Sequence, residues 1–179
     1  MDTVHDHQTH TGLAIGLILI GVAARLVPHA PNVTPLTAMA LFGATYLSRR
    51  WGILLPLATI VLSDLVIGLH DVVLFTWGGF ALTGVVGWWL RRQPSAGRII
   101  GATVAGSLIF FAVSNLGVWL VGDGGTMYPK TAEGLWSCFV AALPFYRNAL
   151  LGDVVYTAGF FGLYALLGQR ALTQTARAR

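Results

Sequence analysis

Long apolar stretches fill most of this chain and are separated by short polar segments, which restricts it to few fold types. The stretches at residues 51–69, 72–90 and 99–121 each approach the roughly 20 residues that a helix needs to cross a bilayer. Only 10% of the 179 residues are charged, whereas 55% are hydrophobic. This composition predicts an integral membrane protein and excludes an ordinary soluble domain.

Three further apolar stretches, at residues 11–27, 36–47 and 148–167, extend the pattern. Residues 131–143 are also apolar, but this segment is too short to cross a bilayer and Pro144 follows it. We therefore expect an all-α integral membrane protein. It is predicted to be a compact bundle of six transmembrane helices with a short re-entrant or interfacial helix near residues 131–146.

Arginines gather in three short clusters that can all face one side of the membrane. They are Arg49–Arg50, Arg91–Arg92 with Arg98, and Arg170 with Arg177 and Arg179. Basic segments beside spans tend to stay in the cytoplasm, so we expect both termini there, in a bacterial cytoplasmic (inner) membrane. A seven-span count would instead place the C-terminal arginines outside. Topology accounts for the net charge of +4, and no nucleic-acid partner is expected.

The expected domain organisation is simple. Residues 1–10 form a polar cytoplasmic tail, residues 11–168 the membrane domain, and residues 169–179 a basic cytoplasmic tail. The histidines of the first tail fit either a weak metal-binding segment or a disordered lead-in. The single cysteine, Cys138, excludes an internal disulfide; it is interpreted as a buried thiol, with a soft-metal ligand as the alternative.

Most remaining ionisable residues fall at the end of the spans opposite the arginine clusters. Charge within a span is costly and often marks a functional site. Asp64 lies inside the 51–69 stretch, and we expect it to pair with Arg25, to orient a ligand-binding loop, or to do both. Three prolines in residues 28–35 predict an ordered, non-helical loop, which carries His29 and Asn32.

Polar and aromatic residues from separate spans converge on the same level and predict a pocket for a small organic solute. The predicted solute-binding residues are Arg147, Asn148, Asn115, Trp119, Phe145, Asn32 and His29, and the predicted structural or gating residues are Arg25, Asp64 and Asp153. The Arg147 guanidinium suits a carboxylate or phosphate, or it pairs with Asp153. Asn115 contacts solute or joins helices.

Aromatic residues cluster near the same end of the spans. They are Trp77, Trp119, Trp136, Tyr128, Phe145 and Tyr146. Such residues form the belts at membrane interfaces, and beside Asn115 they could also wall a pocket for a planar ligand. Small residues at Ala40-x-x-x-Ala44 and Gly97-x-x-x-Gly101 allow helices to approach closely, either within the bundle or against a partner subunit.

The sequence offers little for catalysis. It contains no Gly-x-Ser-x-Gly, no His-Glu-x-x-His and no P-loop, so neither an enzyme nor a bound cofactor is expected. His29, His70 and Asp71 make an incomplete set of metal ligands, and no metal site is predicted. A divalent-metal permease that uses these three residues remains an alternative.

Several segments resemble an uncharacterised bacterial family of proposed transport proteins. They are Arg25-Leu26-Val27-Pro28-His29-Ala30-Pro31-Asn32-Val33-Thr34-Pro35, Ser63-Asp64, Ser114-Asn115-Leu116-Gly117-Val118-Trp119, Ala142-Leu143-Pro144-Phe145-Tyr146-Arg147-Asn148, and Gly152-Asp153 with Tyr156. The resemblance covers about residues 25–166. In organisation the family is similar to the S components of energy-coupling-factor vitamin transporters, six-helix proteins that capture ligand at the outer face.

The resemblance implies a membrane transport protein that binds a small organic solute, a vitamin or related nutrient, at its outer face. It also implies a coupling membrane subunit with ATPases as partners. The alternatives to this function are the divalent-metal permease and a non-transporting scaffold or accessory subunit.

Overall fold

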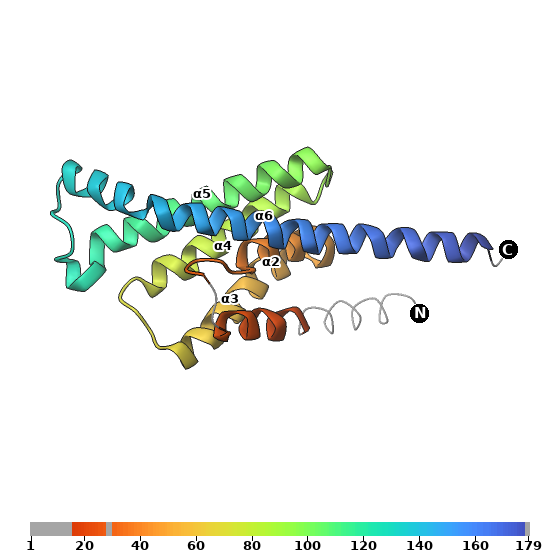
Figure 1. The fold of residues 1–179 in the computed structure, drawn as a ribbon, viewed down its shortest axis with the longest axis horizontal. Coiled ribbons are helices and arrows are strands. Elements are labelled where there is room, and N and C mark those ends of the chain that lie inside the picture. The colour runs from red at the N-terminus through yellow and green to blue at the C-terminus, as the bar shows by residue number, and fades with distance from the viewer. Residues whose placement is uncertain (1–15, 28–29, 178–179) are drawn as a thin grey trace.

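The computed structural model describes residues 16–27 and 30–177, with side chains up to Leu166, and within them every regular element is a helix (Figure 1). The elements are a first helix Gly16–Leu26, α2 Leu36–Phe42 and its π-helical extension η1 Gly43–Leu47, α3 Arg49–Ile67, α4 Val73–Leu90, α5 Ala96–Val121, the 3-10 turn η2 Gly122–Gly125, and α6 Ala132–Arg177. The predicted all-α class is confirmed. The predicted tail at residues 1–10 lies outside the described residues.

Four of these helical segments are long and apolar enough to cross a membrane. They are Arg49–Ile67, Val73–Leu90, Ala96–Gly125 and Ala132–Leu166. The helices Gly16–Leu26 and Leu36–Leu47 are apolar but shorter. The protein is therefore a multi-pass membrane protein with four candidate spans by length and composition.

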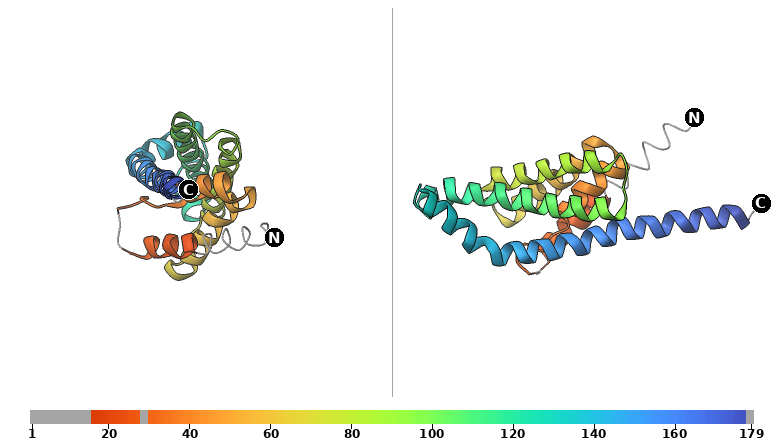
Figure 2. Two further views of the ribbon diagram at one scale, coloured as in Figure 1. Left: turned by 90° about the vertical axis from the view of Figure 1, so that its right-hand side faces the viewer. Right: turned by 90° about the horizontal axis from the view of Figure 1, so that it is seen from above.

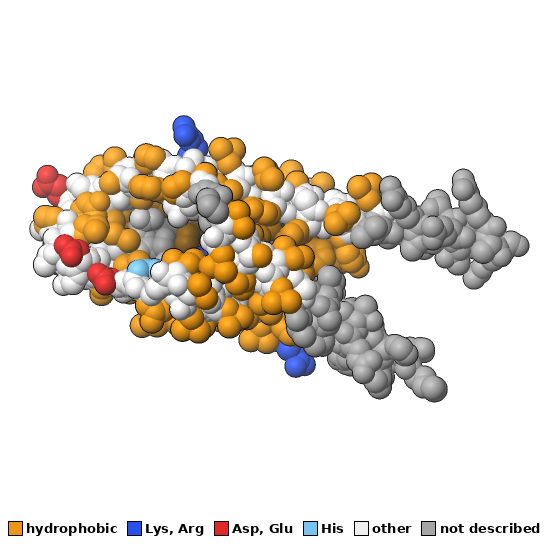
Figure 3. All heavy atoms as spheres, turned by 60° about the horizontal axis from the view of Figure 1, so that its bottom comes forward, with side chains coloured by type: hydrophobic (Ala, Val, Ile, Leu, Met, Phe, Trp, Pro, Cys, Tyr) orange, Lys and Arg blue, Asp and Glu red, His pale blue; other side chains and the backbone are white. Residues whose placement is uncertain are grey.

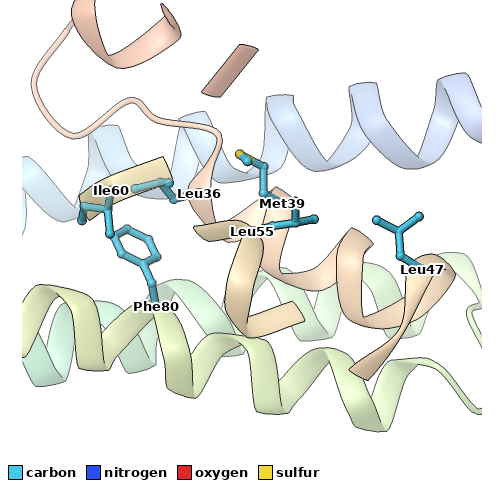
Figure 4. Close-up of a cluster of buried hydrophobic side chains, with 6 residues drawn as sticks. All are labelled: Leu36, Met39, Leu47, Leu55, Ile60 and Phe80. Carbon is cyan, nitrogen blue, oxygen red and sulfur yellow. The ribbon is translucent and has the colours of Figure 1, made fainter. Parts of the chain in front are cut away.

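The short helix α2 lies in the centre of the bundle. All seven of its residues are buried, and it contacts α3, α4, α5 and α6. Its side chains join a core cluster formed by Leu36, Met39, Leu47, Leu55, Ile60 and Phe80 (Figure 4). Because longer helices surround α2, its apolar residues are buried in protein although the helix is too short to span alone.

Small residues let the central helices touch. A Cβ on Gly84 of α4 would lie 2.3 Å from the carbonyl oxygen of Gly52 in α3, and one on Gly52 would lie 2.3 Å from the Ala44 Cβ. The small pair Ala40 and Ala44 therefore packs inside the bundle, where both are fully buried. Gly101 differs, since nothing lies within 4 Å of the Cβ it lacks.

Helix α6 corrects the prediction of a separate short helix near residues 131–146. These residues form the first turns of one helix, which begins after Thr131, whose Oγ1 accepts a hydrogen bond from the Gly134 amide at 3.1 Å. Pro144 lies inside the helix. Proline removes one backbone donor and can kink a helix without ending it. Figure 2 shows in its right-hand view that α6 changes direction along its length.

The connections separate by charge along the bundle. The α3–α4 turn and the segment between α5 and α6 lie at one end, whereas the start of α3, the α4–α5 connection and the end of α6 lie at the other (Figure 1). In Figure 3 the acidic side chains in view gather at the first end, and hydrophobic side chains cover the sides of the bundle. Exposed Asp71, Asp123 and Glu133 belong to that end, and Arg49 and Arg91 to the other.

Candidate ligand-binding site

A cavity of ≈ 200 Å³ lies between α4, α5 and α6, on the side of the bundle's acidic end. Its lining residues are Asn32, Val72, Thr76, Phe110, Phe111, Ser114, Asn115, Val118, Ala142, Phe145, Tyr146 and Ala149. Among the residues described, none of those lining it is charged. Apolar walls with a few polar groups are typical of sites for small organic ligands.

Helical spacing explains which residues reach this cavity. On α5 the lining residues include Phe111 and the residues three, four and seven positions after it, Ser114, Asn115 and Val118. On α6 the lining residues Ala142, Phe145, Tyr146 and Ala149 follow the same spacing. Residues three and four apart share one face of a helix, so each helix presents a single stripe to the cavity.

Three polar side chains of the cavity donate hydrogen bonds to backbone carbonyls of their own helices. Thr76 Oγ1 donates to the Val73 carbonyl at 2.8 Å, Ser114 Oγ to the Phe110 carbonyl at 2.7 Å, and Asn115 Nδ2 to the Phe111 carbonyl at 2.8 Å. A hydroxyl that donates to backbone keeps its lone pairs as acceptors, and an amide keeps its oxygen and one N–H. These three side chains therefore offer chiefly hydrogen-bond acceptors to the cavity.

Aromatic rings form much of the wall. The Phe111 and Tyr146 ring centroids lie 4.7 Å apart and join α5 to α6. Phe110 stacks on Phe80 of α4 at 4.2 Å. Tilted and stacked rings in contact hold one another in place, so these walls are firm surfaces for a flat ligand.

Two further cavities adjoin the first. One, of ≈ 160 Å³, shares Asn32, Thr76 and Phe110 with it and adds Arg25 and His70 to the lining. Asn32 has a positive φ of 64°, a conformation that asparagine tolerates better than most residues. It borders both cavities from the loop between the first helix and α2.

The third cavity, of ≈ 280 Å³, lies at the acidic end. It shares Val72 and Val118 with the first cavity and His70 with the second, and it is also lined by Asp71 and Asp123. No group of three or more His, Cys, Asp or Glu side chains within the described ranges is placed to hold a metal ion.

Arg25, Asp64 and Trp77 form a polar cluster that joins three helices beside the second cavity. An Arg25 nitrogen (Nη2) lies 2.6 Å from an oxygen of the buried Asp64 carboxylate, and Trp77 Nε1 donates to the other oxygen at 2.9 Å. The Nε atom of Arg25 is buried without a hydrogen-bond partner in the described part of the chain. Arg25 therefore retains a donor that its ion pair does not use.

The structure brings some of the predicted site residues together. Asn32, Asn115 and Phe145 line the first cavity, and Arg25 lines the second. Arg147 and Asn148 line neither of them. Successive residues on a helix are about 100° apart, so Arg147, two positions after Phe145, points away from the stripe that carries Phe145. Arg147 is exposed on the outer side of α6.

The other predicted residues lie elsewhere. Trp119 Nε1 donates to the Pro129 carbonyl at 2.9 Å, and Lys130 lies 5.6 Å over its ring, so Trp119 holds the segment before α6. Asp153 is buried deeper in the bundle. His29 lies outside the described residues.

Thr76, Phe110 and Phe111 were not among the predicted site residues. Phe111 is one helical turn before Asn115, so the spacing on a single helix contains a signal for it. The sequence contains no comparable signal for Thr76, because its place in the cavity depends on the packing of α4 against α5.

Comparison with known proteins places the chain in a family. The family model that matches residues 5–176 is described as a family of unknown function, DUF6580. One relative is the biotin transporter BioY of Rhodobacter capsulatus, 36% identical over 75 residues, which cover 41% of this chain and 40% of the relative. The chain thus aligns with well under two thirds of that protein. No solved structure matches.

Proposed function

We propose, on the premise that the chain belongs to the family of unknown function DUF6580, that it is a transport protein that binds a small organic solute. The observation that carries this proposal is the aromatic cavity between α4, α5 and α6, together with the adjoining cavity that contains Arg25. The local similarity to a biotin transporter supports a vitamin or related nutrient as the solute class.

The size of the cavities constrains how the solute lies. Each is below about 300 Å³, the lower end for small-molecule sites, so a solute occupies more than one of them. A flat, uncharged part fits between the rings of Phe111 and Tyr146. An acidic group fits beside Arg25, whose Nε has no partner among the described residues and can donate to it while Asp64 retains the ion pair.

The loop that carries Asn32 then acts as a cover. It lies beside the middle of α6 in Figure 1, and Asn32 borders both cavities. Irregular backbone at membrane depth is tolerated where it is packed in protein or lines a wet cavity. Movement of this loop is the proposed route by which solute enters, with the Arg25–Asp64 pair holding the end of the first helix against α3.

We further propose six crossings, with the first helix and α2–η1 completing the four long spans. The bundle end that carries Arg49 and Arg91 then faces the cytoplasm, and the cavities open outward. Reporter fusions at Arg50, Gln93 and Arg179 in a bacterial inner membrane test this topology. All three are expected to report cytoplasm, and an external C-terminus contradicts the six-span arrangement.

The sequence has no P-loop, so energy from ATP must come from other chains. A coupling membrane subunit with ATPases, as in energy-coupling-factor transporters, is the partner assembly that this proposal expects. Co-purification of tagged protein with such subunits from its native membrane supports that assembly. Solute uptake by the protein alone in proteoliposomes indicates a solitary transporter.

A melting-temperature screen of the purified protein tests solute binding. The panel contains biotin, other water-soluble vitamins and divalent metal ions, each over a range of concentrations. A ligand that binds only the folded state raises the melting temperature. We expect one vitamin to do so. Stabilisation by a divalent metal alone supports the permease, and no stabilisation by any compound supports the scaffold.

A further inference from the structure

Asp153 of α6 is buried within the bundle and has no basic partner among the residues that the structure describes. Its exposed fraction is 6%, and the one ion pair found in the described part of the chain joins Arg25 to Asp64. An ionised carboxylate in an apolar interior is costly unless a positive charge compensates it. Another species must therefore neutralise Asp153.

Hydroxyl groups from three helices surround this carboxyl group. Thr37 of α2 and Ser107 of α5 face it, and Thr157 lies one turn further along the same side of α6. Ser107 and Thr157 are 1% and 3% exposed. Among the described residues the Thr157 hydroxyl oxygen has no hydrogen-bond partner, and that of Ser107 has none apart from the Asp153 carboxyl group itself. Thr103 differs, because its hydroxyl donates to the Ile99 carbonyl at 2.8 Å.

Buried hydroxyl oxygens with no partner other than an uncompensated carboxylate are suited to bind a cation. We propose that Asp153, Thr37, Ser107 and Thr157 form a site for one alkali-metal cation, Na⁺ or K⁺. Oxygen ligands suit hard cations. One carboxylate supplies a single negative charge, so a monovalent ion leaves the site neutral, whereas a divalent ion leaves a net positive charge in an apolar interior.

The site lies directly beneath the floor of the first cavity. Asp153 is one turn inward from the lining residue Ala149, and Ser107 is one turn inward from the lining residue Phe111. Four residues of helix correspond to about 6 Å. A cation here ties together α2, α5 and α6. The site depends on none of the residues assigned to the solute, so it can be tested independently of the proposed function.

The test is the melting temperature of the purified wild-type protein at constant ionic strength. Choline chloride is replaced stepwise by NaCl in one series and by KCl in another. We expect a saturable rise with at least one alkali cation, because a ligand of the folded state stabilises it. Identical melting temperatures in all three salts overturn the proposal and indicate that a proton neutralises Asp153.

Variants locate the site. Asp153→Asn should abolish the cation response, and Ser107→Ala and Thr157→Val should each raise the half-saturating concentration severalfold. Asp123→Asn, at an exposed carboxylate of η2, is the matched control and should respond like the wild type. An Asp153→Asn protein that keeps the full response refutes the assignment.

A direct binding measurement covers the case in which Asp153→Asn fails to fold. Equilibrium dialysis of wild-type protein against ²²Na⁺, with KCl as competitor, should give one displaceable ion per chain if Na⁺ is the cation. Where the melting series responds only to KCl, ⁸⁶Rb⁺ replaces ²²Na⁺ as the tracer for K⁺. Absence of a displaceable ion with both tracers contradicts the proposal.

Discussion

Arg25 and Asp64 lie 39 residues apart in the sequence and form an ion pair of 2.6 Å that joins the first helix to α3. Asp64 is 2% exposed, and the indole of Trp77 occupies its second oxygen. The pair therefore fixes three helices at the point where the chain enters the loop over the cavities. Its strength should be measurable separately from its proposed contact with solute.

Asp64→Asn should destabilise the protein by about 3 kcal/mol, because it leaves a partly buried guanidinium without its charge partner. Unfolding in sodium dodecyl sulfate, followed by circular dichroism, measures the change. Asp123→Asn, at an exposed carboxylate, should have little effect. A fully stable Asp64→Asn protein would show that the ion pair does not hold the helices.

The double variant Arg25→Met with Asp64→Leu separates structure from binding. Replacing both members of a buried ion pair with apolar residues is often neutral or stabilising. We expect the double variant to regain most of the stability lost in Asp64→Asn and to bind solute more weakly than the wild type. Unchanged affinity would mean that Arg25 has only a structural role.

Gly52→Ala and Gly101→Ala form a matched pair that tests the packing of the central helices. The new Cβ at Gly52 would lie 2.3 Å from the Ala44 Cβ, whereas the one at Gly101 meets nothing within 4 Å. Gly52→Ala should cost about 1–3 kcal/mol through overpacking. Gly101→Ala should be neutral or stabilise by up to about 1 kcal/mol, because alanine favours helix more than glycine does. Equal effects of the two changes would contradict the packing described.

Asn115→Ala and Arg147→Ala distinguish the two candidate faces of the site. Asn115 lines the cavity, so its removal should weaken solute binding by about 0.5–1.5 kcal/mol, the usual contribution of one hydrogen bond. Arg147 is exposed on the other side of α6, and its removal should leave affinity unchanged. Isothermal titration with the stabilising vitamin measures both. A loss of affinity in Arg147→Ala but not in Asn115→Ala would instead place the site on the exposed face of α6 that carries Arg147.

Much of the fold could be predicted from the order of apolar and polar residues. The helices α3, α4 and α5 end where arginine or glycine interrupts an apolar run, so they fall close to the predicted ranges. The start of α6 could not be predicted in this way. Pro144 fits both the end of one helix and a kink within a longer one, and neighbouring helices decide between them.

For the site, the sequence predicts the depth of a residue in the membrane but not the direction in which its side chain points. Asn32, Asn115 and Phe145 were expected near the cavity because they occur at its depth, and they line it. Arg147 occurs at a similar depth but faces away, because the rotation of α6 depends on its packing with α5. The sequence pattern fits Trp77 to the interfacial belt or to a pocket wall, whereas its hydrogen bond to Asp64 depends on a contact between α3 and α4.

Saturable binding of tritiated biotin to the purified protein, with unlabelled vitamins as competitors, tests the proposed solute site most directly. The comparison is with Ser114→Leu, which places an apolar side chain in the cavity beside Asn115. Among the described residues, the hydroxyl that this change removes forms hydrogen bonds only within its own helix. We predict saturable binding to the wild type, displaced by the preferred vitamin, and at least tenfold weaker binding to Ser114→Leu, or about 1.4 kcal/mol. Equal binding to both proteins, or no displaceable binding by any vitamin in the panel, would contradict a solute site in this cavity.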